Sequence, residues 1–261
     1  LVDLIALSET CIEEMRKNED MKLSREDARK YKYSNVCHIC SEPFGEKGQA
    51  KVRDHCHITG KFRGAAHACC NINYFSNRYV PVVFHNLRGY DSHLILKEAW
   101  KVASGDIDVI PNSTEKFMSF KIKKLRFIDS IQFMAESLER LADNLHCTGD
   151  DDRYQKFHAM KSQYPEHYEL LCQKGFYPYE WFDDIEKFNY NGLPDINDFY
   201  SAVSQKGINN DQYNHAVKVY ETLKCKTFKD YHLTYLKTDI LLLTDVFENF
   251  RKTCINNYSL D

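Results

Sequence analysis

The stretch that decides the first part of the fold opens with Cys37-His-Ile-Cys40 and closes with His67-Ala-Cys-Cys70-Asn71. Structural zinc is held tetrahedrally by thiolates and imidazoles, and knuckles of the forms C-x2-C and H-x2-C supply four such ligands. We therefore predict a zinc site whose ligands are Cys37, Cys40, His67 and Cys70. The nearby thiols of Cys56 and Cys69 are possible substitutes, and the alternative is that these cysteines are buried without a metal.

Between the two knuckles, the chain places an acidic and a basic residue side by side, Asp54-His55, ahead of a turn at Gly60. Two strands and a helix would bring the oxygens of Asp54 and Asn71 to one hard cation such as Mg²⁺ or Mn²⁺. His55 would then deprotonate a water molecule for attack on a phosphodiester. The alternative is a zinc-stapled loop that binds DNA or stabilises the hairpin without cutting.

The composition describes a folded protein with local basic patches. The chain has 261 residues, is 43% hydrophobic and carries a formal charge of -3, so contact with nucleic acid has to come from patches. One patch surrounds the zinc segment, where we expect Arg63 to contact DNA, and a second lies farther along. Their members are Lys47, Lys51, Arg53, Lys61 and Arg63, and then Lys121, Lys123, Lys124 and Arg126.

Cysteine usage indicates an intracellular, reducing compartment. Five of the ten cysteines lie in the zinc segment and the others are scattered singly, unlike a disulfide framework. No apolar run reaches the roughly 18 residues of a membrane span, and the first residues lack the pattern of a signal peptide. We therefore expect a protein of the nucleus or of a viral factory rather than a secreted or membrane protein.

Periodicity predicts a mixed α/β protein. Residues 1–33 read as two short helices, the second opened by Ser24 and Asp27, and the stretch 150–230 reads as helical and rich in aromatic residues. The other predicted strands are 80–84, 107–110, 117–122 and 125–131, and the other predicted helices are 92–102, 135–144 and 231–258.

Two carboxylates stand out because of their surroundings. Asp91 lies at the junction of a buried strand and a helix, and Asp239 lies four residues after Tyr235 on a helix with an apolar stripe. A carboxylate on an apolar face is costly unless it is paired or bound to a metal, and two of them suit two-metal hydrolysis of a phosphodiester. Taken singly, Asp91 would cap the helix and Asp239 would face solvent.

The string VRDHCHITGKFRGAAHACCN resembles the recombination endonuclease VII branch of the HNH, or ββα-metal, nucleases. The resemblance implies that Asp54 and Asn71 bind Mg²⁺, that His55 is the general base and that His57 is the second histidine of the motif. His67 stands where this family usually has cysteine, a change that we expect to preserve zinc binding.

The remaining motifs resemble another family. FHNLRGYDSHLI, FIDSIQFMAESLERL, KGFYPYEW and YLKTDILLLTDVFENFR resemble the exonuclease region of protein-primed family B DNA polymerases of the Polinton/Maverick, viral or organellar type. This resemblance implies that Asp91 and Asp239 bind the catalytic metal ions and that Tyr235 positions the attacking water. Lys174 would assist near the scissile phosphate, although its short motif is also typical of a turn before a helix.

The same resemblance implies how DNA is bound. Asn86 and Tyr90 would contact the single-stranded 3′ end by hydrogen bonding and base stacking, and Ser130 with Ile131 would hold the strand. The implied fold is an RNase H-like exonuclease without its first strands, carrying a small zinc-bound ββα insert. The expected domains are a helical lead-in over 1–34, the zinc module over 35–78 and the exonuclease-like domain over 79–261.

An Asp-x-Glu pair is expected upstream and the polymerase palm downstream, so the sequence reads as the interior of a longer polymerase, with a priming protein as a further partner. Two other functions stay open. The zinc module would nick DNA through Asp54, His55 and Asn71, or the chain would bind DNA without catalysis.

Overall fold

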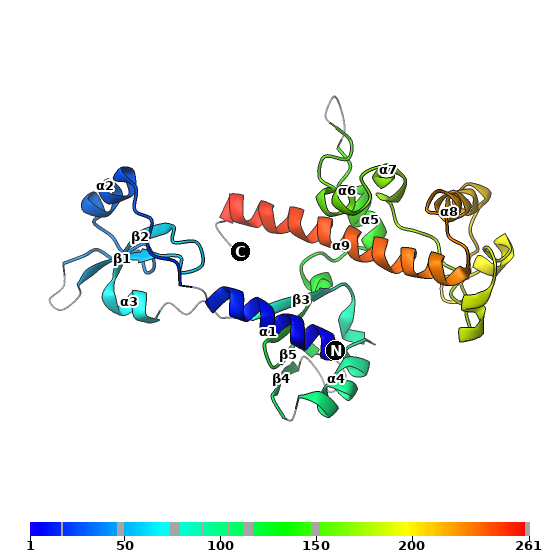
Figure 1. Ribbon diagram of the computed structural model, residues 1–261, viewed down its shortest axis with the longest axis horizontal. Helices are drawn as coiled ribbons and strands as arrows, with labels where there is room; N and C mark the ends of the chain where they lie inside the picture. The colour runs from blue at the N-terminus through cyan, green and yellow to red at the C-terminus, as the bar shows by residue number, and fades with distance from the viewer. Residues whose placement is uncertain are drawn as a thin grey trace. The chain divides into compact units, whose positions relative to one another are not determined.

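The computed structural model describes residues 1–16, 18–45, 50–73, 79–89, 91–103, 105–111, 117–147 and 152–258. The chain divides into two compact units, Leu1–Asp129 and Ser130–Asp261 (Figure 1). This boundary falls inside the stretch 79–261 that we expected to form one domain. The domain limits predicted from sequence stay a prediction.

The two predicted N-terminal helices are confirmed as α1 (Val2–Arg16) and α2 (Arg25–Tyr33). Ser24 Oγ accepts the N–H of Asp27 at 3.1 Å, and the Asp27 carboxylate accepts the N–H of Ser24 at 3.2 Å, which completes the predicted cap. The zinc segment follows as an antiparallel hairpin with a short helix, made of β1 (Lys51–His55), β2 (Phe62–His67) and α3 (Ala68–Asn73).

Gly60 closes the turn between these two strands. Its φ is +72°, and a Cβ at this position would lie 2.4 Å from the carbonyl oxygen of Asp20. Both the backbone conformation and the close approach therefore require glycine.

A four-stranded sheet forms the rest of the first unit, in the order β3-β6-β5-β4. β3 and β6 are parallel, whereas the β6–β5 and β5–β4 pairs are antiparallel. Side chains from α1, α4 and the sheet share one core, in which Phe120 and Phe127 stack with ring centroids 4.6 Å apart. The elements are β3 (Val80–Phe84), η1 (Leu87–Gly89), α4 (Asp91–Val102), β4 (Ile107–Pro111), β5 (Phe117–Ile122) and β6 (Leu125–Asp129).

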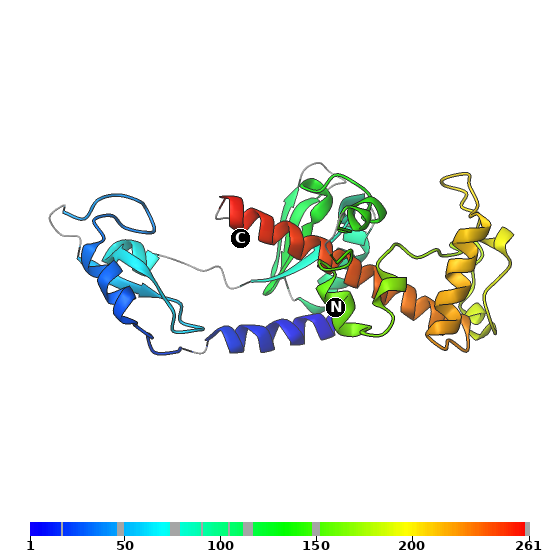
Figure 2. The same ribbon diagram turned by 90° about the horizontal axis from the view of Figure 1, so that it is seen from above.

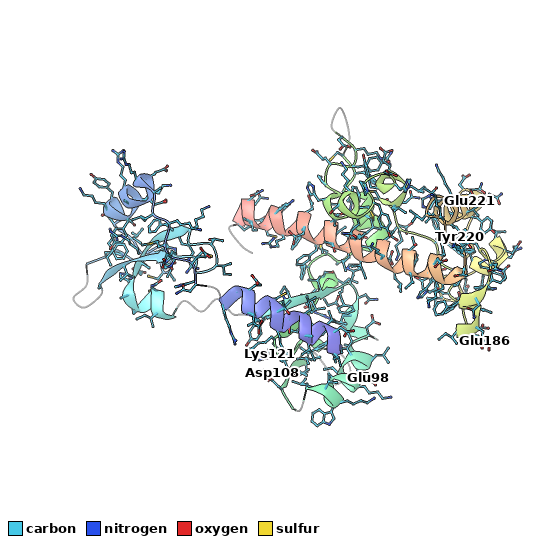
Figure 3. The ribbon with its side chains drawn as sticks, in the orientation of Figure 1. Glu98, Asp108, Lys121, Glu186, Tyr220 and Glu221 are labelled. Atoms are coloured by element: carbon cyan, nitrogen blue, oxygen red, sulfur yellow. The ribbon has the colours of Figure 1, made fainter. Side chains whose placement is uncertain are left out.

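The four predicted strands and the helix of this unit are confirmed, and only one boundary differs by more than one residue. We predicted that the last strand runs to Ile131, but β6 ends at Asp129 and a 3-10 turn, η2 (Ser130–Gln132), follows. The strand ends there because the Ser130 carbonyl accepts the N–H groups of Phe133 and Met134 instead of a ladder bond. On the hairpin β4–β5, Asp108 and Lys121 form an ion pair (Figure 3).

The second unit is built on one long helix, α9 (Phe228–Tyr258), as the apolar stripe predicted. α5, α6 and η3 pack against it, and the green ribbons of α5 and α6 lie beside the orange-to-red ribbon of α9 (Figures 1 and 2). The other elements are α5 (Leu138–Asp143), α6 (His158–Gln163), α7 (Tyr168–Leu171), η3 (Ile185–Asn189), η4 (Ile196–Phe199) and α8 (Asn210–Thr222).

Two predictions for the second unit need correction. α5 begins at Leu138 rather than at Ala135, because Ser137 Oγ caps it by accepting the N–H of Arg140 at 3.2 Å. The stretch predicted as helical is largely irregular between α7 and α8, where only short 3-10 helices form. Contacts among aromatic rings stabilise this irregular stretch. Trp181 and Phe182, for example, pack against Phe228.

A buried carboxylate also ties the second unit together. Asp245 is 3% exposed and accepts the N–H groups of Ala159 at 2.7 Å and of Met160 at 3.0 Å. It thereby satisfies two free donors at the start of α6 from a position on α9. Among the helices that the structure describes, none has the length and apolar character needed to cross a membrane.

Two leucines of α9 give a matched test of this packing. Leu242 is 0% exposed and Leu236 is 44% exposed. We expect Leu242→Ala to lower the free energy of unfolding by about 3 kcal/mol, because it leaves a cavity in the core. Leu236→Ala should cost less than about 0.5 kcal/mol. Urea unfolding followed by circular dichroism measures both, and equal losses would contradict the proposed core.

Candidate metal and nucleic-acid sites

The predicted metal ligands converge in the zinc segment. Donor atoms of Cys37, Cys40, His67 and Cys70 all lie within 4.8 Å of one another. His67 Nδ1 is 3.5 Å from the Cys40 sulfur and 3.9 Å from the Cys70 sulfur. Tetrahedral zinc with ordinary bond lengths separates nitrogen and sulfur ligands by about 3.6 Å, so this donor set fits zinc, with Nδ1 as the ligating atom of His67.

The electrostatics of the cluster also favour a cation. Burial opposes ionisation of Cys37, but the N–H groups of Cys40, His67 and Ile39 stabilise the thiolate and lower its pKa to about 6. Burial and the adjacent sulfurs of Cys40 and Cys37 raise the pKa of Cys70 to about 12. Several thiolates this close repel one another, and a divalent cation among them would remove that cost.

His67 is held by packing. Its Nε2 is buried and accepts or donates no hydrogen bond among the residues described, and the ring of Phe44 lies edge-on at 4.9 Å between centroids. The prediction that these four residues lie together is therefore confirmed. Cys56 and Cys69 are not members of the cluster.

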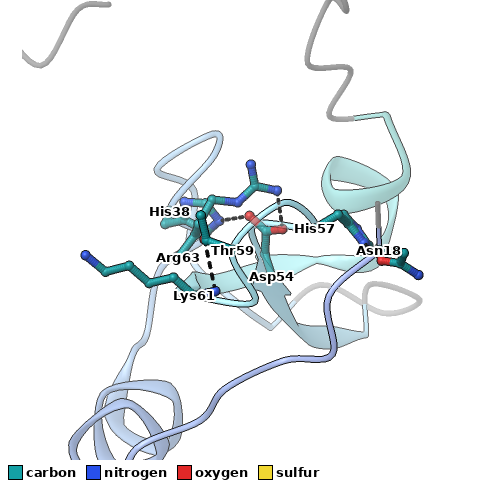
Figure 4. Close-up of polar contacts among 7 residues, drawn as sticks. All are labelled: Asn18, His38, Asp54, His57, Thr59, Lys61 and Arg63. Carbon is teal, nitrogen blue, oxygen red and sulfur yellow. Dashed lines mark hydrogen bonds and ion pairs between the residues drawn. The ribbon is translucent and has the colours of Figure 1, made fainter. Parts of the chain in front are cut away.

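Asp54 lies inside the same module and is 1% exposed. Arg63 donates to its Oδ1 at 2.6 Å, and Nε2 of His38 lies 2.8 Å from its Oδ2 (Figure 4). The carboxylate therefore links the first knuckle to both strands of the hairpin. His38 sits between the knuckle cysteines, and sequence reasoning missed its part in this network because nothing in its spacing points to Asp54.

The other predicted residues of this module lie on the hairpin and on α3. The rings of His55 and His57 have centroids 4.5 Å apart, and Nδ1 of His57 lies 2.6 Å from Oδ1 of Asn18 (Figure 4). Asn71 is half-buried on α3, directly after the last ligand of the cluster. Arg63, which we expected to contact DNA, is also the partner of Asp54.

A second set of predicted residues meets in the second unit. Lys174 Nζ donates to the Tyr235 hydroxyl at 2.9 Å and forms an ion pair with Oδ2 of Asp239. The other oxygen of Asp239, Oδ1, is buried and accepts no hydrogen bond from any residue that the structure describes. Lys174 is separated from Asp239 by 65 positions, so the fold brings two distant motifs into one site.

The irregular segment 174–179 is fastened along α9 at several points. The Phe176 carbonyl accepts the Tyr231 hydroxyl at 2.5 Å, and the Tyr177 hydroxyl lies 2.7 Å from Nδ1 of His232. Gly175 eases this approach, because a Cβ there would lie 3.0 Å from the Tyr235 ring, which is a tight contact.

Tyr179 completes this site, and sequence reasoning did not single it out. Its hydroxyl lies 2.6 Å from the Tyr235 hydroxyl, although the Tyr179 side chain is otherwise exposed. Burial raises the pKa of Tyr235, as do the charge of Asp239 and the Tyr179 contact, so this phenol stays protonated and remains able to donate. The only sequence signal for Tyr179 is its place in the quoted KGFYPYEW motif.

The remaining predicted residues lie elsewhere in the chain. Asp91 is the first residue of α4, and Asn86 is exposed in the turn after β3 with φ of +70°. Ser130 is fully buried and Ile131 is half-buried in η2. Two predictions, for Tyr90 and for Lys47 in the basic patch, concern residues outside the described ranges.

Asp91 belongs to the first unit and Asp239 to the second. The prediction that they share a metal site therefore stays a prediction.

Two known protein families match different parts of the chain. Residues 71–261 match the family described as DNA polymerase type B, organellar and viral, and this range is well over half of the chain. The chain therefore belongs to the organellar and viral type B DNA polymerases. Residues 14–86 match the family described as recombination endonuclease VII. No curated protein and no solved structure matches the chain.

The metal cluster yields a prediction that does not depend on enzymatic activity. Cys40→Ser should weaken zinc binding by more than about 100-fold, because losing a direct ligand costs more than losing an outer partner. Cys69→Ser is the matched control and should keep zinc, as should His67→Cys. Metal content after dialysis against a graded chelator series measures the effect, and zinc retained by Cys40→Ser would contradict the assigned ligand set.

Proposed function

We propose that the chain carries the 3′-5′ exonuclease region of an organellar or viral type B DNA polymerase. One observation carries this proposal: Lys174 meets Tyr235 and Asp239 of α9 in one polar site. The buried and unpartnered Oδ1 of Asp239 supports it further, because such an oxygen is costly unless a ligand such as a cation binds it.

The proposed roles follow from the chemistry of each side chain. Asp91 and Asp239 hold Mg²⁺ or Mn²⁺, which when bound supplies activation of water and neutralises charge on the leaving oxygen. The protonated Tyr235 hydroxyl orients the attacking water. Lys174 holds Asp239 in position through their ion pair, and its ammonium group neutralises charge near the scissile phosphate.

The strand arrangement supports an RNase H-like fold for this region. β3 and β6 are adjacent parallel strands, so the residues that follow them emerge at the same edge of the sheet. Ligands of open α/β sheets bind at the carboxyl ends of the strands. Asn86 and Asp91 follow β3, and Ser130 follows β6, so residues proposed for DNA and metal binding come directly after strands that end at this edge.

The finer assignment rests on the motifs alone. We infer a polymerase of the protein-primed Polinton/Maverick type, acting on mobile-element or viral DNA with a terminal priming protein as partner. Replication of this kind takes place in a nucleus or a viral factory. The proposed domains are the lead-in over 1–34, the zinc module over 35–78 and the exonuclease-like domain over 79–261.

Trimming of a labelled single-stranded oligonucleotide in Mg²⁺ tests this proposal. Asp91→Asn and Asp239→Asn should each slow removal of 3′ nucleotides by about 100-fold or more, because preorganised charge at a reacting phosphate is worth that much. Lys174→Ala should also slow trimming, but by a smaller factor. Glu248→Gln removes a carboxylate from the same helix and should leave the rate unchanged.

Trimming that survives Asp239→Asn at the wild-type rate would refute the assignment. Trimming lost equally in Glu248→Gln would attribute the effect to the helix rather than to the site.

A second candidate function is DNA nicking by the zinc module. The observation that favours it is the paired rings of His55 and His57 beside Asp54, within the range that matches recombination endonuclease VII. The bonds from Arg63 and His38 to both oxygens of Asp54 favour a third function, zinc-dependent DNA binding without cleavage.

Nicking of supercoiled DNA separates these two functions. If the module cuts, His55→Ala should reduce nicking by about 100-fold, the typical worth of a general base, and should still bind zinc. His93→Ala, on α4 outside the module, is the control and should nick normally. Unchanged DNA binding in both variants, with no nicking by the wild type, would leave the binding module as the function.

A further inference from the structure

Asp129 is the last residue of β6 and is 1% exposed. It lies opposite Phe84, the last residue of β3, in the parallel pair. Its Oδ1 accepts the N–H of Asn86 at 2.8 Å, and its Oδ2 accepts the N–H of Arg88 at 3.2 Å. A carboxylate that is desolvated in this way is stable only when donors of this kind face it.

These two bonds fix the backbone of the turn that follows β3. Asn86 has φ of +70°, a left-handed conformation that non-glycine residues adopt rarely and that asparagine tolerates best. Leu87 is buried in the core, whereas the Asn86 side chain is exposed. The carboxylate therefore holds the main chain from inside the protein while the carboxamide of Asn86 faces outward.

The same carboxylate also influences the start of α4. Arg88 Nε lies 3.9 Å from Oδ2 of Asp129, which places a positive charge beside the buried negative one. The Arg88 carbonyl in turn accepts the hydroxyl of the fully buried Ser92 at 3.3 Å. Asp91 lies between these two anchored residues, so the turn and the first residue of the helix are held together.

We propose that Asp129 is a positioning residue, which fixes the Asn86 turn so that the Asn86 side chain meets the 3′ end of single-stranded DNA. This inference rests on the proposed exonuclease function and adds a residue to which no role has been assigned. Asp129 itself stays buried behind the turn and acts through Asn86.

The alternative is that Asp129 only stabilises the fold, and the protein contains a matched control for that case. Asp245 is also a buried carboxylate that accepts two main-chain N–H groups, but these groups open α6, where no DNA-contacting residue is predicted. Asp129→Asn and Asp245→Asn make the same chemical change, since each replaces one acceptor oxygen with a donor that opposes a main-chain N–H.

The test measures binding of a 5′-fluorescein-labelled linear oligothymidylate to the full chain by fluorescence anisotropy. Ca²⁺ replaces Mg²⁺ to suppress trimming. Circular single-stranded DNA serves as an endless competitor. We expect Asp129→Asn to weaken binding of the linear probe about tenfold, the worth of one well-oriented hydrogen bond, and Asp245→Asn to leave it unchanged at a temperature where both are folded.

A double-mutant cycle shows whether Asp129 acts through Asn86. Asn86→Gly removes the carboxamide and keeps a residue that accepts positive φ. It should weaken binding about tenfold by itself, and adding Asp129→Asn should then cost little more. Independent losses in the double variant, unchanged binding by Asp129→Asn, or an equal loss in Asp245→Asn would each overturn the proposal.

Two further outcomes keep the proposals distinct. If the wild-type chain binds circular and linear DNA with equal affinity, it has no site for a 3′ end. The exonuclease proposal then fails together with this one. If Asp129→Asn does not fold, amide hydrogen exchange in the wild type decides. Slow exchange at Asn86 and Arg88 supports the contact with Asp129, and exchange as fast as in exposed loops overturns it.

Discussion

The ion pair between Lys174 and Asp239 joins a segment without regular secondary structure to the helix on which the second unit is built. Asp239 lies on α9 with one of its carboxylate oxygens buried, so its charge needs a partner nearby. Lys174 is that partner. The hydroxyl groups of Tyr177 and Tyr179, in the same segment, form hydrogen bonds with side chains of α9. The polar site and the path of the segment 174–179 therefore have one common cause.

The same constraint recurs at other buried carboxylates. Asp54 is balanced by Arg63 and His38, whereas Asp129 and Asp245 are satisfied by main-chain N–H groups. In each case the carboxylate binds a segment that is distant in sequence. Removing a carboxylate would therefore release a segment as well as a charge, which is why isosteric asparagine variants are the informative ones.

The zinc module uses a different means of stabilisation. Its hairpin and short helix enclose few apolar side chains, among them Phe62, Ala65 and Ala66. Small modules of this kind depend on a metal for their stability, since they cannot bury enough apolar surface. Main-chain N–H groups lower the pKa of Cys37, whereas burial and the neighbouring sulfurs raise the pKa of Cys70, a cost that a cation would relieve.

Local patterns were sufficient where the responsible forces are local. The capping pair of Ser24 with Asp27, the stripe of α9 and the strand at 80–84 act between residues a few positions apart, and they were predicted correctly. The end of β6 at Asp129 and the irregular course between α7 and α8 were not predicted. A local turn at the Ser130 carbonyl decides the first feature, and aromatic packing from distant residues decides the second. The periodicity of apolar residues indicates neither.

The sequence by itself indicated which four residues form the cluster of candidate zinc ligands, because tetrahedral zinc requires spacings that are visible along the chain. Through the family that the motifs resemble, it also assigned Lys174, Tyr235 and Asp239 to one exonuclease site. Only the tertiary structure decided that Lys174 pairs with Asp239, that Tyr179 joins this site and that Asp129 holds the Asn86 turn. Pairing of a buried charge depends on which distant donors the fold brings within about 3 Å, a property of the packed chain and not of its local order.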